Sequence, residues 1–249
     1  MLTFKYSNFN EVYYGLNRWV AENVKEGDAF TGSRVRFRDI VIQVDSPRCD
    51  IIDLSKCGYK RGGKWNILVN KYIDKDALRR TKEELSEGKD NVNFSFVDRY
   101  KRGNSGGDKS GCLKQMVFVK EKKGSYYVSL FWRAVQIETK FAVDLILIYR
   151  VLEYLGIEVK GLNLHLVDVM QDGGNMAYLL EPTFNIKPGR IKGTQSYHKA
   201  IQKVIPQLNR VFPTSSYNSL RMCQEVWLDW FTKAKTLPLT YEKCKLDMD

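Results

Sequence analysis

The sequence has few histidines and cysteines and no long apolar run, and each shortage excludes a class of protein. Only two His and five Cys are present, and no Cys-x-x-Cys pair occurs. A structural zinc site needs clustered ligands of these types, so we expect no metal. The longest apolar run, residues 141–154, is interrupted by Asp144 and Arg150. A membrane span needs roughly 20 apolar residues, so we expect no membrane partner.

The beginning of the sequence also lacks the apolar core of a secretory signal. It reads MLTFKYSNFNEVYYG, in which charged and polar residues interrupt every apolar stretch. Export therefore is not expected, and a cytoplasmic location is. Irregularly spaced cysteines that remain reduced thiols agree with that compartment.

Positive charge is what the sequence has in excess. It contains 40 Lys and Arg against 29 Asp and Glu, a net charge of +11. Such a charge favours polyanionic partners, although lysines that serve only solubility give the same total. Residues 58–64 (GYKRGGK) and 99–102 (RYKR) interleave tyrosine with basic residues, as single-strand binders do. Nucleotides and nucleic acid are therefore both candidate partners.

The hydrophobic pattern predicts one domain over residues 1–249. Adjacent strands with hairpin signals alternate with amphipathic helices, which indicates the α+β class: a mixed, largely antiparallel sheet covered by helices. Helices are expected at 8–25, 74–87 with Asp74 as N-cap, 139–155 between Thr139 and Gly156, 196–210 and 217–233. Strands are expected at 35–44, 67–72, 92–97, 113–119, 126–133, 162–170 and 175–180.

Cys112 is a candidate nucleophile at the junction of a loop and a strand. The preceding loop, GNSGGDKS at 103–110, nearly matches a phosphate-binding P-loop, but Asp108 would oppose a phosphate and a strand follows instead of a helix. Lys109 and Lys114 flank Cys112, and cationic neighbours favour the thiolate. The alternative is an ordinary half-buried thiol.

Two charged residues stand in apolar surroundings and need partners. Asp144 lies on the apolar stripe of the helix expected at 139–155. It is either neutralised inside the protein or a pocket carboxylate that recognises a polar ligand. Arg133 ends an aromatic strand. It calls for an anion, either a ligand phosphate or the carboxylate of Glu138 or Asp144.

The strand expected at 162–170 carries His165 and Asp168. Strict alternation places these two side chains on opposite faces of a sheet. On that reading they do not form an acid–base pair.

From Cys112 to about Pro182 the sequence resembles thymidylate synthases and the related pyrimidine nucleotide hydroxymethylases. The matching series is Cys112 at the start of a strand, a hairpin, Trp132-Arg133-Ala134, and Asp144 eleven residues after Arg133. The helix segment LILIYRVLEYLGI and the strand LNLHLVDVM resemble the segments that follow in the family. The similarity is good over about a third of the chain.

This resemblance implies a thymidylate synthase-like fold and covalent chemistry at C5 of a pyrimidine nucleotide. In the family, the cysteine thiolate adds to C6 of the ring, an arginine binds the phosphate and an asparagine reads the base. The matching positions are Cys112, Arg133 and Asp144, which makes Cys112 and Asp144 the catalytic candidates. Asp in place of Asn is characteristic of the cytosine-specific members, because a carboxylate accepts from the 4-amino group. The family also implies 5,10-methylenetetrahydrofolate as one-carbon donor and a homodimer formed through the sheet.

The sequence departs from the family at several positions around this series. Arg-Ser-x-Asp becomes Arg133-Ala134-Val135-Gln136, which leaves Gln136 as a substrate-binding candidate. Gly-Asp-x-His-x-Tyr becomes VDVMQD at 167–172, and Tyr178 is the candidate for the lost sugar contact. The alternative function is therefore a divergent member of the fold that binds nucleotide or nucleic acid without catalysis.

Overall fold

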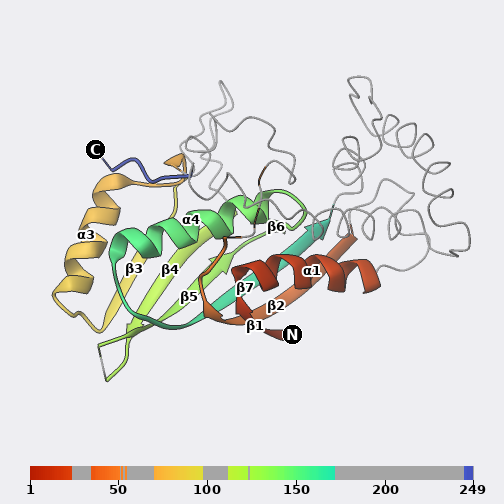
Figure 1. The fold of residues 1–249 in the computed structure, drawn as a ribbon, viewed down its shortest axis with the longest axis horizontal. Helices are drawn as coiled ribbons and strands as arrows, with labels where there is room; N and C mark the ends of the chain where they lie inside the picture. The colour runs from red at the N-terminus through yellow and green to blue at the C-terminus, as the bar shows by residue number, and fades with distance from the viewer. Residues whose placement is uncertain are drawn as a thin grey trace, which may run out of the picture.

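The computed structural model describes residues 1–23, 35–50, 52, 54, 70–97, 112–122, 124–171 and 244–248. In this part of the chain, three helices lie against a seven-stranded sheet (Figure 1). The helices are α1 (Phe9–Asn23), α3 (Lys75–Ser86) and α4 (Lys140–Leu155). The strands are β1 (Leu2–Asn8), β2 (Val35–Ser46), β3 (Asn91–Ser95), β4 (Leu113–Lys120), β5 (Tyr126–Trp132), β6 (Val135–Gln136) and β7 (Val159–Gln171).

The sheet is mixed, as the sequence predicts. Its order is β1-β2-β7-β5-β4-β3, and the short β6 also pairs with β7. The pairs β2–β7, β4–β5 and β3–β4 are antiparallel, whereas β1–β2, β5–β7 and β6–β7 are parallel. The long strand β7 lies in the middle, and it joins the hairpin β4–β5 to the N-terminal strands.

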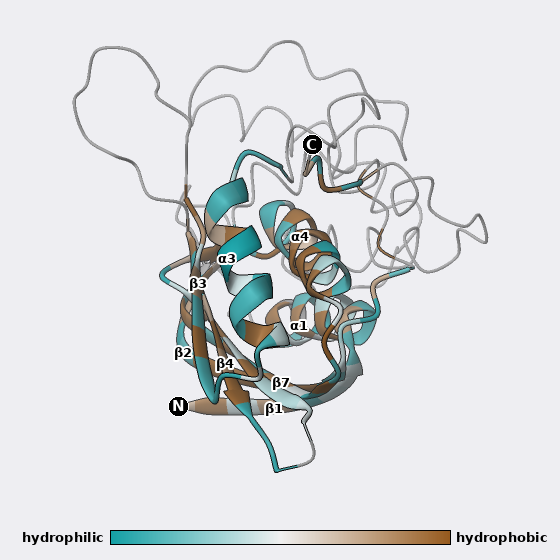
Figure 2. Cartoon of the chain, turned by 90° about the vertical axis from the view of Figure 1, so that its left-hand side faces the viewer, coloured by the Kyte–Doolittle hydropathy of each residue, from teal (hydrophilic) through white to brown (hydrophobic). Residues whose placement is uncertain are grey.

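The three described helices cover one face of the sheet, and no described helix lies on the other (Figure 2). Alternate residues of the central strands point into the layer between sheet and helices, because successive side chains of a strand face opposite sides. The buried positions include Ile40 and Ile42 of β2, Val128 and Leu130 of β5, and Leu162, Leu164 and Leu166 of β7. Helix α4 supplies the largest share of the helical side of this core, since twelve of its residues are buried. Helix α3 is mostly hydrophilic and buries only Leu78, Thr81 and Leu85.

Several expected elements are confirmed. Helix α3 begins after Asp74, whose side chain accepts hydrogen bonds from the amides of Asp76 and Ala77. The hairpin β4–β5 and helix α4 also lie where the sequence places them, and α4 ends at Gly156 in the left-handed conformation. The loop 99–111 and the elements expected at 175–180, 196–210 and 217–233 lie outside the described residues.

Two expectations about strands are corrected. The strand expected at 67–72 does not reach residues 70–72, because residue 70 is helical and residues 71–72 form a turn. Strand β1 was not expected, because the sequence before residue 8 is short and mixes polar with aromatic residues. It forms because Phe4 and Tyr6 pack against helix α1, where Gly15 leaves room for the Tyr6 ring.

Strict alternation along β7 also fails near its end. Leu166 and Val169 are both buried although they are three residues apart, so the pattern shifts at residues 167–168. Opposite this shift, Asp39 of β2 has a φ of 55°. The shift places Asp168 on the same face as His165, which corrects the expectation from alternation. Asp168 lies 3.7 Å from Arg36, so it is engaged in an ion pair.

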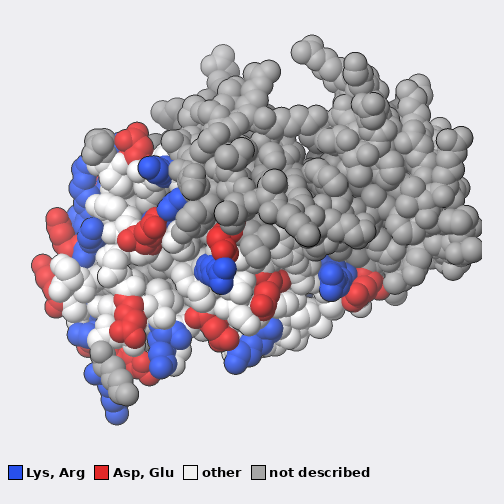
Figure 3. All heavy atoms as spheres, in the orientation of Figure 1, with Lys and Arg blue, Asp and Glu red and all other residues white. Residues whose placement is uncertain are grey.

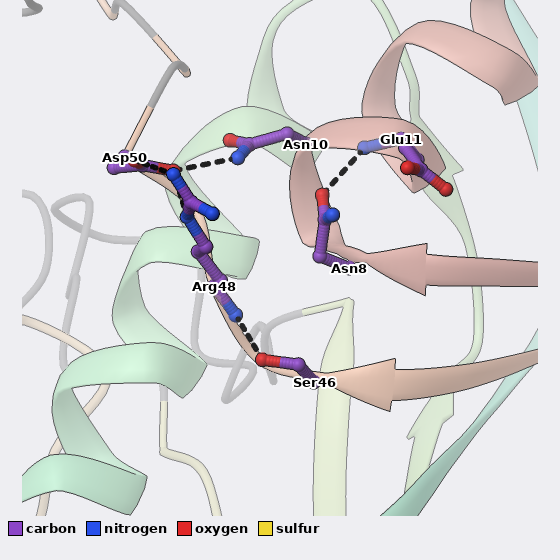
Figure 4. Close-up of polar contacts among 6 residues, drawn as sticks. All are labelled: Asn8, Asn10, Glu11, Ser46, Arg48 and Asp50. Carbon is purple, nitrogen blue, oxygen red and sulfur yellow. Dashed lines mark hydrogen bonds and ion pairs between the residues drawn. The ribbon is translucent and has the colours of Figure 1, made fainter.

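A polar cluster joins the turn between β1 and α1 to the segment after β2 (Figure 4). Asp50 accepts hydrogen bonds from Asn10 Nδ2 at 2.8 Å and from Arg48 Nε and Nη2 at 2.9 and 2.7 Å. The side chain of Asn8 accepts from the amide of Glu11 at 3.1 Å and caps α1. These contacts fix the N-terminal end of α1 on the sheet.

Gly156 provides a direct test of how α4 is terminated. Its φ is 66°, and an added Cβ would meet no atom within 4 Å, so backbone strain alone decides the outcome. We predict that Gly156→Ala lowers the free energy of unfolding by about 1 kcal/mol, because an L residue is strained there. Gly156→Asn is the matched control and loses less, since Asn tolerates this conformation. Urea unfolding followed by circular dichroism measures both; equal stabilities of all three proteins would contradict the assignment.

Candidate functional site

The register of the β4–β5 hairpin places Cys112 beside Arg133. Leu113 is paired with Trp132, and the amide of Arg133 donates to the carbonyl of Cys112 at 2.9 Å. The two residues are 21 positions apart in the sequence, but they are neighbours at one end of this strand pair. Cys112 is half-buried and its thiol is free. The hairpin register therefore fixes the backbones of these two residues relative to each other.

Asp144 is connected to this end of the strand pair through Trp132. The indole Nε1–H of Trp132 donates to Oδ2 of Asp144 at 3.0 Å. Trp132 is 1% exposed and Asp144 is 7% exposed, so the bond lies almost entirely inside the protein. Phe141 contacts the Trp132 ring edge-on, with centroids 5.8 Å apart. Trp132, the residue before Arg133, therefore binds the carboxyl group of Asp144.

Burial has a large effect on the ionisation of Asp144. Removal from water raises the pKa of this carboxyl to about 7, because the charged form loses its hydration. The hydrogen bond from Trp132 and the positive charges of Lys71 and Lys140 act in the opposite direction. Near neutral pH the group is therefore divided between its protonated and its ionised form.

Helix α1 holds the segment that leads into α4. Tyr13 Oη donates to the carbonyl of Glu138 at 2.9 Å, and Asn17 Nδ2 donates to the carbonyl of Ile137 at 3.3 Å. Both side chains are buried, so these bonds are shielded from water. They fix the start of α4, and with it the height of Asp144 above the sheet.

Arg133 does not have the intramolecular partner that its sequence context allowed. Its residue is exposed, and among the described residues its guanidinium forms no ion pair with Glu138 or Asp144. The alternative of an internal carboxylate is therefore not supported for this arginine. An exposed guanidinium beside a free thiol is available to bind an anion from solution.

Gln136 is in β6, where its backbone pairs with Met170 of β7. The resemblance places a carboxylate that contacts the ring at this position, and Gln136 offers a neutral amide instead. Gln136 alone does not define a folate site among the described residues, so no chemical step is derived through that cofactor. Tyr178 lies outside the described residues.

The pocket found on the described surface does not involve the candidate site residues. A shallow pocket of about 270 Å³ is lined by Arg79, Lys82, Glu83, Ser86 and Tyr154 of α3 and α4. None of the residues expected at the site lines it. Within the described ranges no group of metal-ligating side chains is present, and none of the helices there is long and apolar enough to cross a bilayer.

Basic and acidic side chains are intermingled on the described part of the face shown in Figure 3. Among the described residues several basic and acidic side chains are paired with each other, for example Arg79 with Asp76 at 2.9 Å and Lys89 with Glu84 at 2.9 Å. The two segments expected to bind nucleic acid, 58–64 and 99–102, lie outside the described residues. The part that is described therefore adds no support for a polyanion-binding surface.

Comparison with known proteins does not assign the chain to a family. No protein-family model matches it, and a search of curated proteins finds no match. The resemblance to thymidylate synthases therefore rests on the residues and spacings of the sequence itself.

The role of Trp132 was missed from the sequence. It was noted only as part of an aromatic strand and as the neighbour of Arg133. A buried tryptophan needs an acceptor for its indole N–H, and a buried carboxylate needs a donor. These two complementary needs, twelve residues apart, were the signal that could have paired them.

The ionisation of Asp144 predicts how stability depends on pH. The carboxyl has a pKa of about 7 in the folded protein, against 3.8 for an ordinary aspartate. The folded state therefore binds the proton more tightly, and this contribution to stability is lost as pH rises from about 4 to about 7. We predict that Asp144→Asn, which keeps an acceptor for Trp132, becomes progressively more stable relative to wild type across this range. Urea unfolding at several pH values measures it; parallel curves for the two proteins would contradict it.

Proposed function

We propose that the protein is an enzyme that activates C5 of a pyrimidine nucleotide for one-carbon transfer, with a cytosine nucleotide as substrate. The observation that supports this most strongly is the placement of Cys112 and Arg133 at one end of β4 and β5, next to Trp132, which binds Asp144. The amide of Arg133 donates a hydrogen bond to the carbonyl of Cys112. The indole of Trp132, the residue before Arg133, donates a hydrogen bond to the carboxyl of Asp144. A nucleophile, a phosphate ligand and a base-reading group are thus arranged around one strand end.

The chemistry assigned to this arrangement begins at the ring. The thiolate of Cys112 adds its electron pair to C6 and forms an S–C6 bond. The C5–C6 double bond breaks, and its electrons make C5 nucleophilic. C5 then forms a bond to a one-carbon electrophile and gives up its own proton to water, and the electrons of that C5–H bond restore the C5–C6 double bond as the S–C6 bond breaks and the thiolate leaves. Arg133 binds the phosphate and so holds the ring against the thiol.

Asp144 selects the base in this proposal. Its ionised carboxyl accepts a hydrogen bond from the 4-amino group of cytosine, a contact that the 4-oxo group of uracil does not make. The protein is proposed to work in the cytoplasm, where the described thiols of Cys49, Cys112 and Cys244 stay free.

The test of the proposal is loss of tritium from C5. The protein is incubated with dCMP, CMP or dUMP labelled at C5, each with and without methylenetetrahydrofolate. We predict release from a cytosine nucleotide, because addition of Cys112 alone labilises the C5 hydrogen. Cys112→Ser is predicted to reduce release by at least about a hundredfold with little change in nucleotide affinity, since the hydroxyl is a far weaker nucleophile. Cys49→Ser is the matched control, because Cys49 is buried elsewhere, and it retains release.

The outcomes separate the parts of the proposal. Release by Cys112→Ser at the wild-type rate would remove Cys112 from the mechanism. Release from dUMP only would keep the C5 chemistry and contradict the role of Asp144. No release from any substrate would favour the binding protein without catalysis.

A homodimer formed through the open face of the sheet is part of the proposal. This face, opposite the helices, carries four exposed apolar residues: Val119, Tyr127, Phe131 and Val167. Phe131 also stacks on His165, with centroids 4.6 Å apart and an interplanar angle of 10°. Asn93, Gln115, Ser129 and Asn163 fill positions between them on the paired strands. These positions are apolar or uncharged, and a centre depleted of charged residues is typical of subunit interfaces.

A charge placed in this face tests the dimer. Tyr127 is 43% exposed in the single chain, so Tyr127→Asp is compatible with the fold but would bury a charge in the dimer. We predict that wild type sediments as a dimer and Tyr127→Asp as a monomer in analytical ultracentrifugation. Ser86→Asp on the outer side of α3 is the control and remains dimeric. A monomeric wild type would contradict this part of the proposal.

A further inference from the structure

The two oxygens of the Asp144 carboxyl are not equivalent. Oδ2 accepts the hydrogen bond from Trp132 at 3.0 Å, and this bond is buried. The residue keeps 7% of its surface exposed, and the hydrogen bond from the indole does not engage Oδ1. Because Trp132 is fixed by its place in β5 and by the edge of Phe141, the carboxyl is held in one orientation.

We propose that Trp132 is a positioning residue for base recognition, which presents Oδ1 of Asp144 to the group at C4 of the pyrimidine, and that the proton on Oδ1 chooses the base. When Oδ1 is ionised it accepts from a 4-amino group, as in cytosine. When it is protonated it donates to a 4-oxo group, as in uracil. This inference rests on the proposed function and adds to it a second base and the residue that controls the choice.

The hydrogen bond from the Trp132 indole determines which oxygen of the Asp144 carboxyl carries the proton. An N–H that donates to Oδ2 repels a proton on the same atom, so the protonated carboxyl carries its hydrogen on Oδ1. The group is thereby limited to one donor state and one acceptor state toward the ligand. A carboxyl without this contact could rotate and present either oxygen in either state.

The charged groups around Asp144 allow the two states to exchange near neutral pH. Lys140 acts on it from the same helix, and Lys71 acts on it from the segment before α3. The contact from β5 is the neutral indole of Trp132. Burial raises the pKa to about 7 against the effect of these three groups.

The first measurement follows the indole N–H of Trp132 in the wild-type protein as the pH changes. In a spectrum of nitrogen-15-labelled protein, each of the five tryptophans gives one indole signal. The signal of Trp132, assigned as the one missing in Trp132→Phe, is predicted to shift between about pH 5.5 and about pH 8.5 with a midpoint near the pKa of Asp144. In Asp144→Asn the signal is present and does not shift over this range. A signal that does not titrate in wild type would overturn the inference.

The second measurement is nucleotide affinity as a function of pH. The ratio of the dissociation constants of dUMP and dCMP is predicted to rise by about tenfold or more from the acidic to the basic end, the range expected when a hydrogen bond to a charged group is gained. Asp144→Asn makes the ratio independent of pH. Trp132→Phe moves the midpoint of the change to higher pH, because the ionised carboxyl loses its donor. Loss of packing alone would weaken both nucleotides and leave the midpoint in place.

Trp19→Phe is the matched control for the tryptophan substitution. Trp19 packs edge-on against Phe4 of β1 and Phe37 of β2, two strands separated from β5 by β7, so its variant is predicted to keep the wild-type midpoint. Binding of both nucleotides with a ratio that does not change with pH would overturn this inference and leave the proposed function standing. Binding of neither nucleotide would overturn both.

Discussion

The hydrogen bond between the indole of Trp132 and the carboxyl of Asp144 is the constraint on which the rest of the site depends. It joins the end of a central strand to the helix that contributes most to the core. Neither group can be buried alone without cost, because an unpaired indole N–H and an unpaired carboxyl each lose their hydration. Their pairing therefore fixes α4 against β5, and it keeps a titratable group near the strand end that carries Cys112 and Arg133.

The sheet supplies the second constraint. The register of the hairpin fixes Cys112 and Arg133 relative to each other through the backbone, independently of the side chains they carry. The hairpin lies between β7, which is parallel to β5, and β3, which is antiparallel to β4. Helix α1 adds buried hydrogen bonds to the segment before α4. Every described element that carries a candidate residue is thus tied to the same core, which is how a site on rigid elements keeps its geometry.

Local signals in the sequence were sufficient for much of the described fold. Asp74, Gly156 and the turn between β4 and β5 mark their elements by capping and turn chemistry, which depend on neighbouring residues only. Strand β1 was missed because it is stabilised by contacts with α1. The shift in β7 at residues 167–168 was missed because it depends on its partner strand. Within the site, the candidates Cys112, Arg133 and Asp144 followed from spacing and resemblance, whereas the contact of Trp132 required the packing of α4 on β5.

The most direct test of the central claim is a crystal structure of the protein with a cytosine nucleoside monophosphate. The account predicts the phosphate against the guanidinium of Arg133, C6 of the ring in van der Waals contact with Sγ of Cys112, and the 4-amino group within hydrogen-bond distance of Oδ1 of Asp144. The indole of Trp132 would remain on Oδ2. A nucleotide bound elsewhere, for example in the pocket between α3 and α4, or a ring turned away from Cys112, would contradict the account.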